Sequence, residues 1–220
     1  MLGVLGDYSD DFVFLGSCAL ALYAREQGHV LTATKDVDCI SLMPLPDYLQ
    51  FFAELAAPGG PLIPEPQVQC RYRLRESALF VDIMDVEGKT IGATNPWFKR
   101  AAERASTYKL DDGRNVRAVS PPFFLATKLV ALRDLERCPE IDSAKDAEDI
   151  VTLAVEMPDL VAQVSAEDIA ADVAAEWQAV FDAHRIDSSD LPELVDAHLG
   201  RDDRSFRARV VSCLRALADG

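Results

Sequence analysis

The stretch FVFLGSCALALYA, residues 12–24, decides how the first part of this 220-residue chain is built. Residues 12–15 are all apolar and have the length of a short buried strand. Gly16-Ser17 follows at once, and the alanines and leucines after it favour a helix. Glycine lets a backbone approach phosphate closely, and a serine hydroxyl with the free N–H groups of a helix start can bind it. The stretch therefore predicts a strand, a tight turn and a helix, with Gly16 and Ser17 as nucleotide-binding residues.

A second motif, Asp36-Val37-Asp38, alternates acid, apolar residue and acid. Side chains alternate between the two faces of a strand, so both carboxylates point to one face and Val37 points to the other. Neighbouring like charges repel unless a cation lies between them, and carboxylate oxygens are the ligands that Mg²⁺ prefers. The triplet predicts a divalent metal site, with an exposed acidic turn as the alternative.

A third acid, Asp82, lies inside the apolar run of residues 79–84. A carboxylate in such surroundings costs free energy unless a cation or a metal accompanies it. We therefore expect Asp82 to join Asp36 and Asp38. Asp85 falls on the opposite face of the same predicted strand and is the weaker candidate.

The segments FLGSCALAL, residues 14–22, and TKDVD, residues 34–38, together resemble the polymerase-β nucleotidyltransferase superfamily. The order of the parts is glycine and serine, helix, Thr-x-Asp-hydrophobic-Asp, third Asp, and a helical tail with Lys and Asp. This order is similar to that of the AbiEii/MenT-type nucleotidyltransferase toxins. The resemblance covers about residues 12–155. The sequence departs from the family in the length of residues 18–35 and in Thr32, which stands where many relatives have Arg.

The resemblance implies an enzyme that moves a nucleoside monophosphate from an NTP to an acceptor hydroxyl. Asp36, Asp38 and Asp82 would be catalytic and hold Mg²⁺ or Mn²⁺, with two ions expected, and Gly16 and Ser17 would hold the terminal phosphates. An RNA acceptor, such as a tRNA 3′ end in a toxin–antitoxin system with an antitoxin partner, is one option. A small cationic acceptor of the aminoglycoside kind is the second. A nucleotide-binding regulator without catalysis is the alternative outside enzymes.

Lys128 lies on the apolar stripe of a helix predicted over residues 120–137, with Leu135 further along the same stripe. A desolvated ammonium needs an anion, and Asp146 on the apolar arc of the following helix is the expected partner. A buried salt bridge that ties two helices together is one interpretation. The resemblance adds another, in which Lys128 is catalytic and binds the nucleotide together with Asp146 or, as a weaker choice, Asp149.

The two halves of the chain differ in pattern. Residues 1–119 mix short β-like runs with helices and contain a Pro/Gly-rich segment, 58–66, that predicts a loop. Residues 120–220 are an almost continuous helical pattern. We expect an α+β protein, with a polymerase-β-like mixed sheet and flanking helices as a catalytic domain over 1–119. A helical bundle over 120–220 would complete the cleft.

Two local signals predict where elements turn or begin. The pair Asp112-Gly113 tolerates positive φ and predicts the turn of a hairpin over residues 106–119. Ser165 with Asp168 three residues later predicts a capping box at a helix start.

Charge limits the partners. The formal net charge of −15 argues against DNA, because phosphate backbones are held mainly by Lys and Arg. Residues 68–120 are nevertheless net basic, with 10 Lys and Arg against 7 Asp and Glu. An RNA acceptor would meet this stretch, and a solvated protein surface is the alternative.

Other residue types exclude further classes. The five cysteines are odd in number, scattered and without CxxC spacing, so we expect reduced thiols. His29, His184 and His198 have no serine or cysteine partner in a motif, which argues against a hydrolytic triad or a zinc site. No apolar run approaches the roughly 18 residues of a membrane span, so we expect a cytoplasmic protein without a membrane partner.

Overall fold

The computed structural model describes residues 1–26, 34–86 and 95–220 of an α+β protein. The chain divides into two compact units. The sheet unit is formed by Met1–Arg25 and the described residues up to Ser120, and the helical unit contains Pro121–Gly220.

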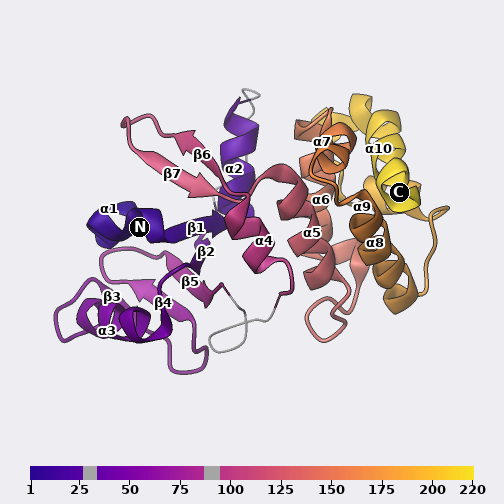
Figure 1. Cartoon of the computed structure of the whole chain (residues 1–220). Helices are drawn as coiled ribbons and strands as arrows, with labels where there is room; N and C mark the ends of the chain where they lie inside the picture. Colours follow the sequence, from indigo (N-terminus) through magenta and orange to yellow (C-terminus); the bar gives the residue numbers. More distant parts are fainter. Residues whose placement is uncertain (27–33, 87–94) are drawn as a thin grey trace. The chain divides into compact units, whose positions relative to one another are not determined.

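A seven-stranded mixed sheet organises the sheet unit, with the strand order β3-β4-β5-β2-β1-β7-β6 (Figure 1). Strands β2 and β5 are parallel neighbours, as are β1 and β7, whereas β1 and β2 are antiparallel. The strands are β1 (Phe12–Leu15), β2 (Asp36–Ser41), β3 (Leu62–Pro64), β4 (Arg71–Leu74), β5 (Phe80–Asp85), β6 (Ser106–Lys109) and β7 (Asn115–Ala118).

Helix α3 covers one face of this sheet. Its Phe52 ring lies 6.0 Å from that of Phe12 on β1 and 5.3 Å from that of Tyr72 on β4, between centroids. Because side chains alternate along each strand, Phe12 and Tyr72 point away from the face that carries Asp38. The helical segments of this unit are α1 (Leu2–Leu5), η1 (Gly6–Asp11), α2 (Ser17–Glu26), α3 (Leu45–Leu55) and α4 (Phe98–Glu103).

The helical unit is built around aromatic and aliphatic side chains of several helices, and residues 121–220 contain no strand. Trp177 on α8 is fully buried, and its ring lies 5.6 Å from that of Phe181. The segments are α5 (Pro121–Leu132), η2 (Ile141–Ser143), α6 (Lys145–Glu156), α7 (Leu160–Ala166), α8 (Ala170–His184), α9 (Leu191–His198), η3 (Arg201–Phe206) and α10 (Arg207–Asp219).

The predicted strand, turn and helix over residues 12–24 are present as β1, Gly16 and α2. The predicted hairpin is present as β6 and β7, with Gly113 at φ +84° in its turn. The segment 58–66, predicted as a loop, contains strand β3. This strand pairs only with β4 at one edge of the sheet, where a proline such as Pro64 is tolerated because its missing N–H has no ladder partner to lose.

The helix predicted over residues 120–137 ends earlier, at Leu132. The carboxylate of Asp134 accepts a hydrogen bond from the backbone N–H of Glu136 at 3.0 Å, a local contact that competes with helix continuation. Leu135 therefore lies outside the helix and is 48% exposed, contrary to its predicted place on the apolar stripe.

The predicted capping box at Ser165 and Asp168 is wrong. Ser165 lies near the end of α7, and its hydroxyl donates to the carbonyl oxygen of Val161 at 3.0 Å. Asp168 has φ +55°, a left-handed conformation that interrupts the chain before α8 instead of starting a helix.

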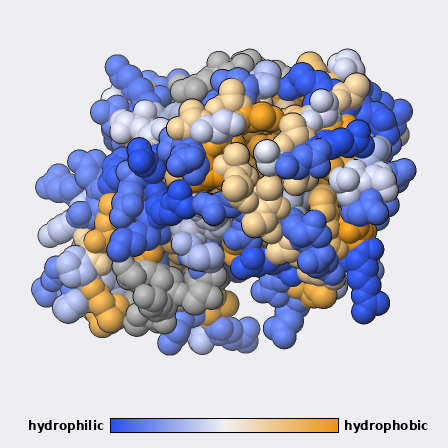
Figure 2. Space-filling view, turned by 45° about the vertical axis from the view of Figure 1, so that its right-hand side comes forward, coloured by the Kyte–Doolittle hydropathy of each residue, from blue (hydrophilic) through white to orange (hydrophobic). Residues whose placement is uncertain are grey.

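The cysteines are free thiols, as the sequence predicts, and the visible surface is mixed (Figure 2). Figure 2 shows one face of the molecule, with hydrophobic residues exposed in patches among hydrophilic ones. All five cysteines are free, and four of them are buried. Across the described ranges, no helix is both long and apolar enough to pass through a bilayer.

Candidate functional site

The sheet brings the three predicted acids to one face. Strands β2 and β5 run in register, with Asp38 beside Asp82 and Asp36 beside Phe80. Neighbours in register point to the same face of a sheet, as do residues two apart on one strand. Asp36, Asp38 and Asp82 therefore share a face, which we call the carboxylate face. Asp85 lies on the other face, as the alternation predicts.

The Gly16 turn presses against one of these acids. Leu15 at the end of β1 is paired with Asp38, and Gly16 follows with φ +66°. A Cβ atom at Gly16 would lie 2.0 Å from Oδ2 of Asp38, well inside van der Waals contact. Only glycine combines this backbone conformation with room for the carboxylate. The backbone carbonyl of Gly16 then accepts a hydrogen bond from the N–H of Ala19 at 3.0 Å, in the first turn of α2, which begins at Ser17.

Arg71 is the residue that the sequence motifs did not assign to the site. On β4 it is the register neighbour of Asp82, and its guanidinium holds both carboxylate oxygens, with Nε to Oδ1 at 2.7 Å and Nη2 to Oδ2 at 2.6 Å. The hydrogen bonds to Asp82, and the charges of Asp82, Asp36 and Asp38, raise the pKa of Arg71 above its ordinary value despite partial burial. Arg71 is therefore a counter-ion of Asp82 on the carboxylate face.

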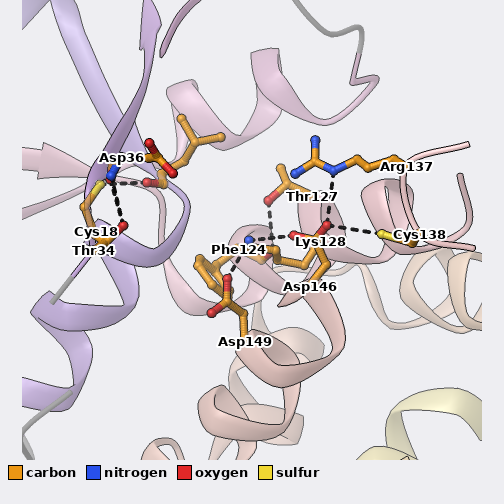
Figure 3. A network of polar contacts seen from close by, with 11 residues as sticks. Cys18, Thr34, Asp36, Phe124, Thr127, Lys128, Arg137, Cys138, Asp146 and Asp149 are labelled. Atoms are coloured by element: carbon orange, nitrogen blue, oxygen red, sulfur yellow. Dashed lines mark hydrogen bonds and ion pairs between the residues drawn. The ribbon is translucent and has the colours of Figure 1, made fainter. Parts of the chain in front are cut away.

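Two further side chains next to the carboxylate face make local hydrogen bonds to the backbone (Figure 3). The hydroxyl of Thr34 accepts from the N–H of Asp36 at 3.2 Å and donates to its carbonyl oxygen at 3.0 Å. The thiol of Cys18 donates to the carbonyl oxygen of Leu15 at 2.8 Å. Burial and the nearby charge of Asp38 raise the pKa of Cys18 to about 12. Cys18 is thus a neutral thiol, with no thiolate available as a nucleophile.

The donor set of the carboxylate face fits a hard divalent cation. Carboxylate oxygens are the ligands of Mg²⁺ and Mn²⁺, and the three acids with Arg71 carry a net charge of −2. Within residues 1–26, 34–86 and 95–220, however, no three His, Cys, Asp or Glu side chains are placed to hold one metal ion. Both oxygens of Asp82 accept hydrogen bonds from Arg71. His29 and Thr32 lie outside the described residues.

The helical unit contains a second charged cluster, seen in Figure 3. The ammonium of Lys128 lies 2.7 Å from Oδ1 of Asp146 and 2.6 Å from Oδ2 of Asp149. Arg137 contacts the other oxygen of Asp146 with Nε at 3.3 Å, and the thiol of Cys138 lies 3.7 Å from that same oxygen. The predicted Lys128–Asp146 contact is present, and Asp149, the weaker choice, is an equal partner.

Opposite charges favour the ionised forms of Lys128 and Asp146. Burial alone would lower the pKa of Lys128, but the carboxylates of Asp146 and Asp149 outweigh it and leave the pKa above its ordinary value. Burial likewise opposes ionisation of Asp146, yet Lys128 and then Arg137 hold its pKa below the usual 3.8. Two cations, Lys128 and Arg137, face two anions, so the group is neutral as a whole. These contacts favour the salt-bridge interpretation of Lys128.

The basic stretch 68–120 is partly used inside the sheet unit. Besides Arg71, several of its arginines make contacts with neighbouring carboxylates or backbone oxygens. These are Arg73 with Glu65 at 3.8 Å, Arg75 with Gly60 at 2.5 Å, Arg114 with Asp112 at 2.5 Å and Arg117 with Asp10 at 3.0 Å. The stretch therefore offers less uncommitted positive charge to an RNA than its composition indicates.

The chain matches no protein-family model, no curated protein and no solved structure. One cavity of about 320 Å³ is lined by Tyr8, Asp47 and Phe51 among others, and another of about 240 Å³ is lined by Phe14, Val37 and Arg114 among others. Neither is lined by the three acids. The candidate site is the carboxylate face of the sheet beside the Gly16 turn.

Proposed function

We propose that the protein is a metal-dependent nucleotidyltransferase, which moves a nucleoside monophosphate from an NTP to an acceptor hydroxyl. One observation carries the proposal: Asp38 and Asp82 are neighbours on two parallel strands, Asp36 shares their face, and the Gly16 turn lies against Asp38. Phosphoryl-type transfer needs mainly positioning and charge neutralisation, and this arrangement is suited to both.

Each residue then has a defined task. Asp36, Asp38 and Asp82 would hold Mg²⁺, which when bound neutralises charge on the phosphate oxygens. The N-terminus of α2 at Ser17, reached through Gly16, binds the terminal phosphates with its hydroxyl and N–H groups. The acceptor oxygen forms a bond to the α-phosphorus, the bond to the bridging oxygen breaks, and pyrophosphate leaves. The proton of the acceptor hydroxyl passes to Asp82.

Lys128 has a separate place in the proposal. A nucleotide-binding role requires its ammonium to exchange two carboxylates at 2.7 and 2.6 Å for phosphate oxygens. Such an exchange leaves Asp146 and Asp149 buried with less counter-charge, which is costly. We therefore assign Lys128 and Asp146 to the structure of the helical unit and leave the nucleotide to Gly16 and Ser17.

The decisive test uses labelled NTPs. The protein is incubated with each of the four NTPs, Mg²⁺, and either cellular RNA or a panel of aminoglycosides. Asp36→Asn and Asp38→Asn should each reduce label transfer by about 100-fold or more, since the site loses anionic metal ligands. Asp85→Asn, on the opposite face of β5, is the matched control and should retain activity. Full transfer by both site variants would contradict the proposal.

The same experiment separates the acceptor classes. Transfer to RNA should weaken steeply when the salt concentration is raised, because contacts with phosphates release counterions. Transfer to an aminoglycoside places the acceptor among small cations, for which the net charge of −15 provides long-range attraction.

A further inference from the structure

Arg71 pairs with Asp82, one of the three proposed metal ligands. Its two hydrogen bonds to Asp82, at 2.7 and 2.6 Å, form a bidentate pair between neighbouring strands. The guanidinium carbon also lies 5.5 Å from the ring centroid of Phe80, the register neighbour of Asp36. Arg71 thus shares its electrostatic surroundings with all three acids of the carboxylate face.

Resting on the proposed function, we propose that Arg71 is an internal counter-ion that competes with the metal for Asp82 and, once displaced, binds the triphosphate. In the arrangement seen here the guanidinium provides the positive charge that Asp82 needs. A divalent ion at the same carboxylate is repelled by the guanidinium, because two cations then share one anion. Metal binding therefore requires the ion pair to loosen.

The displaced guanidinium needs a new anion. The side chain of Arg71 is 34% exposed, against 14% for Asp82, so it can turn toward solvent without crossing the core. Its planar fork matches phosphate oxygens as well as it matches a carboxylate. The triphosphate of an NTP bound at the carboxylate face would be the new anionic partner of the Arg71 guanidinium. Arg71 thereby couples metal binding to nucleotide binding.

The proposal predicts opposite effects on two affinities. Without nucleotide, Arg71→Ala should bind Mn²⁺ more tightly than the unaltered protein, on the order of tenfold, because one nearby positive charge is removed. With saturating Mn²⁺, the same variant should bind a non-hydrolysable NTP analogue more weakly, also on the order of tenfold, because a phosphate contact is lost. Calorimetry measures both affinities, and circular dichroism checks the fold.

Arg73→Ala is the matched control. Arg73 lies two residues along β4 on the same face, carries the same charge, and pairs with Glu65 at 3.8 Å instead of with Asp82. This variant should leave both affinities within about twofold of the unaltered protein, since Arg73 pairs with Glu65 and not with an acid of the carboxylate face. An equal change in both variants would reduce the effect to overall charge and overturn the proposal.

Further outcomes are equally informative. Mn²⁺ affinity that is unchanged or weaker in folded Arg71→Ala would overturn the competition, and unchanged analogue affinity would overturn the phosphate role. If Arg71→Ala does not fold, Arg71→Lys keeps the charge and loses the bidentate fork. The lysine variant should then bind Mn²⁺ more tightly than the unaltered protein, because a single ammonium gives up Asp82 more readily than the bidentate guanidinium does.

The proposed function fails by a different measurement. It fails if the unaltered protein transfers no label from any NTP, whatever the affinities of the Arg71 variants. Conversely, label transfer with unchanged affinities in Arg71→Ala retains the enzyme and rejects the role of Arg71.

Discussion

The two charged clusters of this protein differ in balance and in exposure. In the helical unit, Lys128 and Arg137 face Asp146 and Asp149, and the side chains of Lys128 and its two aspartates are 11% exposed or less. On the sheet, Arg71 pairs with Asp82 near the charges of Asp36 and Asp38, and the side chains of Arg71 and Asp82 are 34% and 14% exposed.

The difference in net charge between the two clusters indicates which of them needs an external cation. The charges of the four groups of the helical cluster sum to zero, and the contacts of Lys128 with Asp146 and Asp149 hold α5 to α6. The carboxylate face keeps an excess of two negative charges among its four groups, which a divalent ion can neutralise. A neutral cluster stabilises, whereas a cluster with excess negative charge is suited to binding a cation.

We expect the largest effect from a substitution that removes the central cation of the helical cluster. Lys128→Met should destabilise the helical unit by about 3–5 kcal/mol, because two buried carboxylates lose their main counter-ion. Urea unfolding, followed by Trp177 fluorescence in a Trp97→Phe background, measures the change within this unit. Lys145→Met removes the same charge from an exposed position on α6 and should change stability by less than about 0.5 kcal/mol.

A smaller effect concerns the turn beside the carboxylate face. Gly16→Ala should cost about 1–3 kcal/mol of stability through its positive φ, and it should also displace the Asp38 carboxylate. Gly113→Ala has the same kind of backbone strain at φ +84°, with nothing within 4 Å of its added Cβ. Both variants should lose stability, but only Gly16→Ala should lose Mn²⁺ affinity. Equal Mn²⁺ affinity in the two variants would show that the close contact of Gly16 with Asp38 does not affect metal binding.

The smallest expected effect is the acid response of the helical cluster. The folded pKa of Asp146 is depressed, so its contribution to stability is complete above the unfolded value near 3.8 and is lost as the pH falls through the folded value. Between pH 5 and pH 3 the unaltered protein should lose more stability than Asp146→Asn. The comparison uses urea unfolding at each pH. If the stability of the two proteins falls equally between pH 5 and pH 3, Asp146 does not contribute to the loss of stability in acid.

Much of the site could be predicted because it depends on short-range pattern. Alternation along a strand requires Asp36 and Asp38 to share a face, and the apolar run around Asp82 requires that acid to have a charged companion. The same reasoning placed Lys128 toward Asp146. In each case a period of two or of 3.6 residues, together with the cost of a lone buried charge, determines the outcome.

The partners across strands could not be predicted in the same way. Arg71 reaches Asp82 because β4 pairs with β5 in a particular register, and one step of slip would put the two side chains on opposite faces. The end of α5 at Leu132 and the left-handed Asp168 likewise depend on local competition that the periodic pattern does not contain.

The sequence by itself determined the strand, turn and helix over residues 12–24, the shared face of Asp36 and Asp38, and the pairing of Lys128 with Asp146. These follow from periodicity and from the cost of burying charge. Only the tertiary structure decided that Asp82 faces Arg71, that Asp149 shares Lys128, and that Gly16 leaves room for Asp38. Those contacts join residues distant in the chain, and strand register and helix packing select them.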